Sequence, residues 1–224
     1  MAKRPTSGSK KPRTKLMRVD AKRALAIPEF EKMRLWARTT LYDARPASDP
    51  RLVRNATIVL VLLGTAARRF ELCAFRCGDF RKSYSGQPRC YFEAGKGNVE
   101  AEINVSTDTW DAVHRWLAFK KAIGESTAAE APLFCGLPGE HLSVAQLHNI
   151  WVAVCEALNV GRRTGIHVAV HQARHTAGFL YLRATKSLAE TADFMRHKSQ
   201  EITERFYKHV LDEDIAAGLK KAGL

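Results

Sequence analysis

Two histidines and an arginine that lie close together in the sequence have the residue types of a phosphate-binding site. His171 and Arg174 are three positions apart at the start of a predicted helix, so their side chains share one face, and His175 follows directly. A guanidinium can donate two parallel hydrogen bonds to two phosphate oxygens, and an imidazole can donate a third. A capping histidine beside a surface arginine is the structural alternative, and these residues alone favour it.

Two further cations extend the pattern. Arg68 lies where a predicted apolar helix ends, and Glu71 follows three positions later, which predicts an arginine held at the edge of the core by a carboxylate. Lys96 lies in a Gly-Lys-Gly-Asn turn between two predicted strands, where a long cationic side chain can reach across a groove. A salt bridge for Arg68 and an exposed turn tip for Lys96 are the structural alternatives.

An imidazole and a phenol lie closer to the C-terminus. His197 follows a short predicted helix, and Tyr207 lies ten positions later. A phenol with a pKa of about 10 is a poor nucleophile at neutral pH, so a reactive tyrosine needs a base or a strong positive field. A helix cap and a partly buried aromatic ring are the structural alternatives.

In this order and spacing, the residues resemble the catalytic domain of tyrosine recombinases, the phage integrase family. The segments that carry the resemblance are TAARRFEL at 65–72, GKG at 95–97, HQARHT at 171–176, MRHKS at 195–199 and YKHV at 207–210. The resemblance extends over roughly residues 28–215 and depends on all parts occurring in order.

The resemblance implies a site-specific DNA recombinase. Such an enzyme cuts one strand through a 3′-phosphotyrosyl intermediate and passes that strand to the 5′ hydroxyl of another, without metal or ATP. The implied roles are phosphate clamping by Arg68 and Arg174, protonation of the departing 5′ oxygen by Lys96, assistance to the tyrosine proton by His171, hydrogen bonding to the phosphate by His197, support of Arg68 by Glu71 and nucleophilic attack by Tyr207.

The chain departs from the family pattern around these motifs. Ala66 and Ala67 replace the glycine and leucine that commonly precede the first arginine, and Ala173 replaces a leucine. We interpret these as packing changes. Arg196 replaces the glycine before the second histidine, which adds a cation beside the site, and we expect it to contact DNA.

The spacing of the tyrosine is a further departure. Many family members place the nucleophile nine residues after the second histidine, where this chain has Phe206, and Tyr207 is tenth. Either the connection is one residue longer, or the nucleophile has been lost to Phe206. The ending Tyr-x-His-Val matches the family and favours Tyr207.

Charge supports nucleic acid as the partner class. With 36 Lys and Arg against 23 Asp and Glu, the chain carries a formal net charge of +13. Residues 1–23 carry +8 of it together with prolines, serines and a glycine, which predicts a disordered basic arm. We expect the arm to contact the backbone of double-stranded DNA, although a solubilising tail has the same composition. The candidate contacts are Lys10, Lys11, Arg13 and Lys15.

Composition restricts the cellular setting. At 46% hydrophobic and 26% charged residues the chain is globular, and its longest nearly apolar run, 56–67, is too short to span a bilayer. The chain opens without a secretory leader pattern, and its five cysteines include no CxxC pair. We therefore expect a protein of the reducing cytoplasm, nucleoid-associated if its source is prokaryotic or viral.

The predicted fold is α+β, mostly helical, with a small three-stranded antiparallel sheet. Helical periodicity is present at 28–41, 51–64, 69–76, 107–121, 143–158, 171–184, 188–195, 200–209 and 212–222, and strands are expected at 79–84, 89–94 and 100–105. The expected parts are the arm (1–23), a catalytic domain (24–210) and a C-terminal helix (211–224).

Two features bear on assembly. The resembling enzymes usually carry a helical domain upstream, and only the arm and one helix precede the core here, so we expect these to replace part of that clamp. In the C-terminal segment Ile215, Ala216, Leu219 and Ala222 form an apolar stripe, which folds back on the core or docks on a neighbouring protomer in a dimer to tetramer on DNA.

Three rival functions remain open at this point. The same fold can serve an inactive DNA-binding regulator, or a type IB topoisomerase that relaxes supercoils with the same tyrosine chemistry. His171 and His175 also have the spacing of zinc ligands, but Gln172 stands where a metalloprotease has its general-base glutamate, and no third ligand is evident. We therefore expect no metal site.

Overall fold

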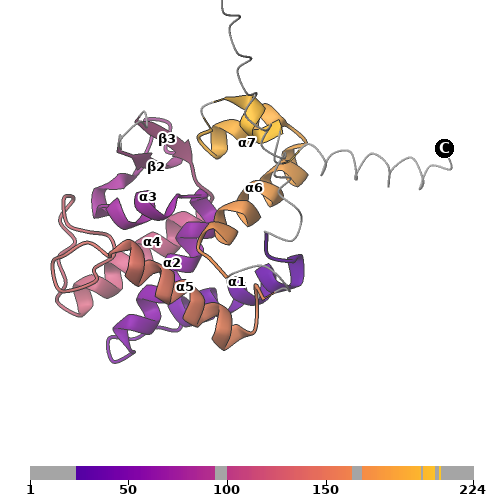
Figure 1. Ribbon diagram of the computed structural model, residues 1–224. Coiled ribbons are helices and arrows are strands. Elements are labelled where there is room, and N and C mark those ends of the chain that lie inside the picture. Colours follow the sequence, from indigo (N-terminus) through magenta and orange to yellow (C-terminus); the bar gives the residue numbers. More distant parts are fainter. Residues whose placement is uncertain (1–23, 94–99, 163–167, 198, 205–206, 208–224) are drawn as a thin grey trace, which may run out of the picture.

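The computed structural model describes residues 24–93, 100–162, 168–197, 199–204 and 207. Its helices and strands, in chain order, are α1 (Ile27–Tyr42), α2 (Pro50–Thr65), α3 (Arg69–Ala74), β1 (Phe80–Lys82), β2 (Pro88–Phe92), β3 (Ala101–Asn104), α4 (Thr107–Ala122), α5 (Val144–Leu158), α6 (His171–Thr185) and α7 (Leu188–Phe194), with a 3-10 turn at Cys77–Asp79 (Figure 1). The predicted fold class, mostly helical with a small antiparallel sheet, is confirmed. The arm at 1–23 and the C-terminal segment at 211–224 lie outside the described residues.

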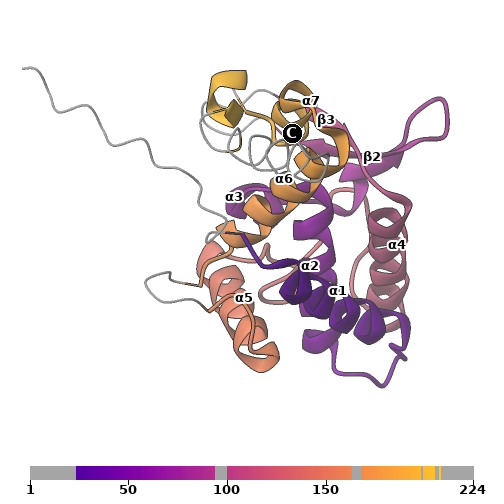
Figure 2. The ribbon, with the colours of Figure 1, turned by 90° about the vertical axis from the view of Figure 1, so that its right-hand side faces the viewer.

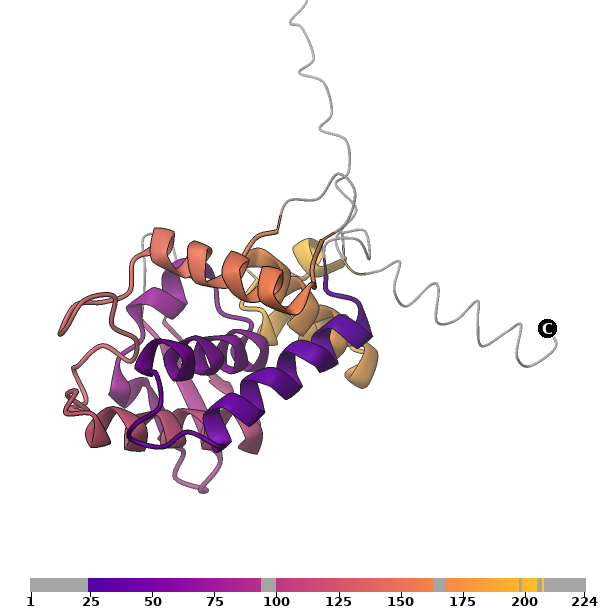
Figure 3. The ribbon, with the colours of Figure 1, turned by 90° about the horizontal axis from the view of Figure 1, so that it is seen from below.

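Helix α2 is the centre of the fold. Its side chains Val53, Ala56, Val59 and Leu62 are buried, and the helix contacts α1, α4, α5 and α6. Figure 3 shows α1, α4 and α5 arranged around it. The helix begins after Asp49, whose side chain accepts a hydrogen bond from a first-turn N–H. It was predicted as an apolar, buried helix because polar residues are nearly absent from its second half.

The three-stranded sheet has the order β1-β2-β3 and is antiparallel throughout. Cys90 lies opposite Phe80 on one side and Ile103 on the other, and these buried side chains form the inner face of the sheet. On the outer face, Glu102 of β3 accepts hydrogen bonds from Arg89 of the adjacent β2 and from Arg81 of β1 beyond it. The strands are shorter than predicted, and at the start of β1 the reason is that the 3-10 turn takes the first expected position.

Helices α6 and α7 pack together beside α2. Figure 2 shows α6 running alongside α2, with α7 near its C-terminal part. The stacked rings of Tyr181 and Phe194, 4.4 Å between centroids, join the two helices. A second small hydrophobic cluster of Leu182, Met195 and Tyr207 lies on the same side. This packing brings the segment after α7 against the chemistry-bearing face of α6.

One predicted helix extends too far, and another is only partly described. The helix expected at 69–76 ends at Ala74, because Phe75 adopts extended backbone angles. The helix expected at 200–209 is seen through residue 204 and again at Tyr207, with its remaining positions outside the described residues. All five cysteines are unpaired, and within the described ranges none of the helices is both long and apolar enough to cross a membrane.

Candidate active site

Arg174 is the buried centre of the site. It lies on the first turn of α6 and is only 3% exposed. Its guanidinium donates to the Ala66 carbonyl at 2.6 Å and to the Met195 carbonyl. Burial, together with the charges of Arg68 and Arg196, lowers the pKa of Arg174 to about 9. Such a concentration of positive charge away from water attracts an anion.

The loop that follows α2 is shaped to hold this arginine. Ala66 adopts a left-handed conformation, φ 49°, which is uncommon for a residue other than glycine. The turn ends α2 and directs the Ala66 carbonyl toward α6, where Arg174 meets it. The contact joins residues 108 positions apart in the sequence.

Arg68 is partly exposed and is held by Glu71. One nitrogen of its guanidinium donates to Glu71 Oε1 at 2.6 Å, and its backbone N–H donates to Glu71 Oε2 at 2.6 Å. The other terminal nitrogen donates to the Arg196 carbonyl at 2.8 Å. The Arg68 side chain keeps 30% of its surface exposed, whereas Glu71 is nearly covered. The predicted carboxylate support of Arg68 is therefore present, and part of Arg68 faces solvent.

Glu71 remains charged inside this cluster. Burial opposes its ionisation, but the charge of Arg196 and the hydrogen bonds from Arg68 together lower its pKa below the ordinary value. A single carboxylate thus lies among three guanidinium groups, so the cluster keeps a net positive charge.

Arg196 faces the protein interior, whereas the sequence led us to expect a DNA contact. Its side chain is 7% exposed and lies over the ring of Phe92, 3.7 Å from the ring centroid. Its guanidinium donates, at 2.9 to 3.0 Å, to Glu71 Oε2 and to the carbonyls of Thr65, Ala66 and Phe194. With both terminal nitrogens bonded to these acceptors and 7% of the side chain exposed, Arg196 has little surface for a DNA phosphate.

His197 lies beside the arginines and is uncharged at neutral pH. Its Nδ1 lies 2.7 Å from Oγ1 of the buried Thr203. Burial and the nearby charges of Arg174 and Arg68 lower the pKa of His197 to about 4. When Nδ1 accepts from Thr203, the proton is on Nε2, which can then donate to a phosphate oxygen.

His171 opens α6 at the edge of a cleft. The cleft, about 350 Å³, lies between the starts of α3 and α6 and is lined by Arg68, Phe70, Val144 and His171 among others. The ring of His171 meets that of His175 edge to face, 4.5 Å between centroids. In the described part of the chain, no three His, Cys, Asp or Glu side chains gather to hold a metal.

Tyr207 is buried against α6. It is 2% exposed, and its hydroxyl lies 3.2 Å from His175 Nδ1. Burial raises the pKa of Tyr207, while the charge of Arg174 acts to lower it. Gly178 leaves the room that the phenol needs, because a Cβ there would lie 2.9 Å from the hydroxyl oxygen.

The structure therefore gathers most of the predicted residues. Those it brings into one region are Arg68, Glu71, His171, Arg174, His197 and Tyr207. Lys96, Phe206 and the arm residues Lys10, Lys11, Arg13 and Lys15 lie outside the described residues. Sequence reasoning gave no separate role to His175 and did not single out Thr203. The position of His175 directly after Arg174 was the available signal for the first, and nothing in the sequence marked the second.

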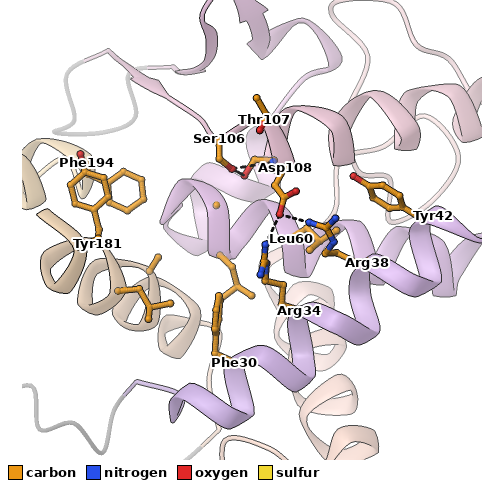
Figure 4. A pocket seen from close by; sticks show the side chains of 16 residues that line it. Phe30, Arg34, Arg38, Tyr42, Leu60, Ser106, Thr107, Asp108, Tyr181 and Phe194 are labelled. Carbon is orange, nitrogen blue, oxygen red and sulfur yellow. Dashed lines mark hydrogen bonds and ion pairs between the residues drawn. The ribbon is translucent and has the colours of Figure 1, made fainter.

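A larger cavity, about 730 Å³, lies away from this site. It is formed between α1, α2, α6 and the start of α4, with an apolar wall that includes Phe30, Leu60 and Tyr181 (Figure 4). Asp108 lies at its polar end and accepts hydrogen bonds from Arg34, at 2.7 Å, and from Arg38. None of the predicted site residues lines this cavity.

A sequence model of the phage integrase family matches residues 38–214, which include the whole site. The chain belongs to this family. Among curated relatives, tyrosine recombinase XerC of Corynebacterium glutamicum is 26% identical over 181 residues, covering 80% of this chain and 54% of the relative. XerC of Mycobacterium tuberculosis is 26% identical over 203 residues, covering 89% of this chain and 64% of the relative. The chain thus spans about half to two thirds of the length of these integrase-family relatives.

Solved structures share the fold of this family member. XerH site-specific recombinase bound to palindromic difH substrate, in a post-cleavage complex, matches with a TM-score of 0.67 at 18% identity, over 90% of this chain and 52% of that chain. A lambda integrase dimer bound to a COC' core site matches with a TM-score of 0.58 at 16% identity, over 81% of this chain and 47% of that chain. At these identities the likeness shows the fold alone.

Proposed function

We propose that this member of the phage integrase family is a site-specific DNA recombinase that cuts and rejoins double-stranded DNA through a 3′-phosphotyrosyl intermediate. The observation that carries the proposal is the convergence of Arg68, Arg174 and His197 on one region, with the phenol of Tyr207 within the field of Arg174. A phosphate clamp and a nucleophile are thereby supplied by segments that are far apart in the sequence.

The cluster is suited to stabilising the charge that develops on a phosphate. Arg68 and His171 line one cleft, Arg68 keeps part of its side chain exposed, and Arg174 is buried and held by the Ala66 and Met195 carbonyls. The uncharged His197 adds a hydrogen-bond donor. Donors fixed before the reaction need no reorganisation, and loss of one such donor costs about 3 kcal/mol in the transition state.

The proton balance of cleavage assigns the remaining groups. Tyr207 Oη gives its proton to an imidazole, and His175 is in contact with that hydroxyl while His171 lies next to His175. The phenolate forms a bond to phosphorus, the bond to the 5′ oxygen breaks, and that oxygen takes a proton from Lys96. Rejoining reverses these steps with the 5′ hydroxyl of another strand.

The reaction requires neither ATP nor a metal in this proposal. The phosphotyrosyl bond conserves the free energy of the phosphodiester, so religation needs no further energy source. The three arginines supply the positive charge that other phosphoryl-transfer enzymes take from metal ions.

The decisive experiment uses a nicked suicide substrate that traps the covalent intermediate. The full chain should give an SDS-resistant protein–DNA adduct that is lost in Tyr207→Phe and kept in Phe206→Ala. An adduct that persists in Tyr207→Phe would place the nucleophile at another residue, and the absence of any adduct would reject the enzyme.

One observation favours a second candidate, a DNA-binding regulator without strand cleavage. The hydroxyl of Tyr207 is buried and held by His175, and position nine after His197 is Phe206. A regulator would bind DNA with an affinity that falls as the salt concentration rises. It would form no covalent adduct under any condition. The suicide substrate separates the two candidates directly.

Oligomerisation on DNA, as dimer to tetramer, is the second part of the proposal. The apolar wall of the cavity in Figure 4 suits the stripe of Ile215, Leu219 and Ala222 from a neighbouring protomer. The acidic residues 212–214 precede that stripe, and the cavity carries two arginines at its polar end. Truncation after Val210 should abolish oligomers on DNA, and intact oligomers in the truncated protein would reject this docking.

The basic arm forms the third part. We propose that Lys10, Lys11, Arg13 and Lys15 contact the DNA backbone, because residues 1–23 carry a net charge of +8. A protein that acts on DNA in this way belongs at the nucleoid in a prokaryotic cell. Co-purification with the nucleoid fraction, lost on treatment with nuclease, tests that location.

A further inference from the structure

Arg196 has an uncommon backbone conformation, and both terminal nitrogens of its guanidinium are hydrogen-bonded. Its φ of 52° lies in the left-handed region, which L side chains rarely adopt. Residues persist in such conformations when the surrounding structure determines them. Here the side chain is buried, and its guanidinium has four acceptors on three different segments.

Two of these acceptors, the Ala66 carbonyl and Glu71, also hold the two candidate phosphate-clamping arginines. The Ala66 carbonyl accepts from both Arg196 and Arg174, at 3.0 and 2.6 Å. Glu71 binds Arg196 through Oε2 and Arg68 through Oε1. The guanidinium of Arg196 therefore bridges the support of Arg174 and the support of Arg68.

The main chain of this segment completes the bridge. The carbonyl of Arg196 accepts from Arg68, and the carbonyl of Met195, one residue earlier, accepts from Arg174. A shift of the 195–196 segment would displace both clamping arginines together. The side chain of Arg196 prevents this shift, because it ties the segment to Thr65 and Ala66 at the end of α2.

We propose that Arg196 is a positioning residue for strand cleavage: it sets the relative placement of Arg68 and Arg174 and does not bind DNA itself. The inference rests on the proposed function, since cleavage is the step that needs both clamping arginines. It differs from a structural role in predicting a specific loss of cleavage rate at saturating DNA. Misplacement of a catalytic group by about 1 Å costs on the order of 100-fold in rate.

The test compares DNA affinity with the single-turnover rate of adduct formation at saturating suicide substrate. Arg196→Gly suits the left-handed backbone and removes every side-chain contact. We expect its DNA affinity to stay within about threefold of the wild type and its cleavage rate to fall about 100-fold. Arg196→Lys keeps the charge beside Glu71 but loses the forked guanidinium. We expect its cleavage rate to lie between those of the wild type and Arg196→Gly.

The matched control is Arg45→Gly. Arg45 also donates to main-chain carbonyls, those of Asp43 and Ala44, but it lies in the loop before α2, at the opposite end of that helix from Ala66. We expect this variant to bind and cleave as the wild type does. A rate loss shared by both glycine variants would overturn the inference, since it would reflect general destabilisation.

Other outcomes also decide the question. A large loss of DNA affinity in Arg196→Gly with an unchanged rate at saturation would make Arg196 a DNA contact and overturn the inference. If Arg196→Gly fails to fold, the folded Arg196→Lys variant decides, and wild-type cleavage by it would overturn the inference. An absence of adduct in the wild-type protein rejects the proposed function as well, so the two failures are distinguishable.

Discussion

The hydroxyl of Tyr207 lies 3.2 Å from Nδ1 of His175, the residue that directly follows the buried Arg174. The candidate nucleophile is therefore held by an imidazole on the same helix that carries the phosphate-binding face. His175 in turn meets His171, so two imidazoles connect the phenol with the edge of the cleft.

Replacing this imidazole should slow cleavage in a pH-dependent manner. Because His175→Ala removes the acceptor nearest to the phenol, we expect the adduct rate at neutral pH to fall at least about 100-fold, with partial recovery at higher pH as hydroxide takes over. Single-turnover rates on the suicide substrate, measured between about pH 6 and pH 10, test this expectation. That range spans roughly the ordinary pKa values of an imidazole and a phenol. A rate equal to that of the wild type across this range would exclude His175 from the proton path.

Loss of the charge on Glu71 should destabilise the fold. Glu71→Gln leaves the buried guanidinium of Arg196 without its anion, and breaking one side of a buried ion pair costs about 3 kcal/mol. Urea unfolding at neutral pH measures the loss. The control is Glu156→Gln, which breaks an exposed pair with Arg162 and should cost less than about 1 kcal/mol. Equal effects of the two substitutions would contradict the prediction.

His197 should make the fold sensitive to mild acid. Its pKa of about 4 lies below the value of 6.5 expected for a free imidazole, so the unfolded chain binds a proton more readily than the folded chain. The free energy of unfolding therefore decreases as the pH falls from about 6.5 to about 4, by up to about 3 kcal/mol from this group. His197→Asn removes the titration and should flatten the dependence. Identical slopes in the two proteins would refute this assignment.

Gly178 should be intolerant of a side chain. A Cβ at this position would lie 2.1 Å from Met195 Sδ and 2.9 Å from Tyr207 Oη, so both side chains must move. We expect Gly178→Ala to cost about 1 to 3 kcal/mol and to expose the phenol. Nitration of Tyr207 followed by mass spectrometry reports the exposure. The control is Ala177→Ser, on the same helix α6 as Gly178. Gly124 is unsuitable as a control, because its positive φ would strain an alanine there. Unchanged nitration of Gly178→Ala would show that Tyr207 does not depend on this space.

Removal of residues 1–23 should weaken DNA binding through charge. Phosphate contacts release counterions, and the dependence of affinity on salt becomes shallower when such contacts are lost. We expect lower affinity and a smaller slope of log K against log salt concentration. Equal slopes for the full and shortened chains would show that the arm makes no phosphate contacts.

The elements of the fold were largely predictable because their patterns are local. The apolar run after Asn55 predicted the central helix α2, and the aromatic and β-branched residues of β2 predicted a strand. Boundaries were less accurate where the backbone changed direction for tertiary reasons, as at Phe75.

The site was predictable in its residue types and less so in its contacts. The three-residue spacing of His171 and Arg174 fixes them to one helix face whatever the rest of the chain does. The direction in which the Arg196 side chain points depends on Thr65, which is 131 positions away. In the sequence alone, a cation beside the site is as consistent with DNA contact as with burial.

By itself, the sequence determined the helical α+β class, the basic character and the set of groups able to bind and attack a phosphate, because these follow from composition and short-range periodicity. Tertiary structure alone decided that Arg196 turns inward, that Glu71 is shared between two arginines and that His175 holds Tyr207. Each of these depends on which distant segment supplies the partner, and that is settled only when the segments after α2 and α7 pack against α6.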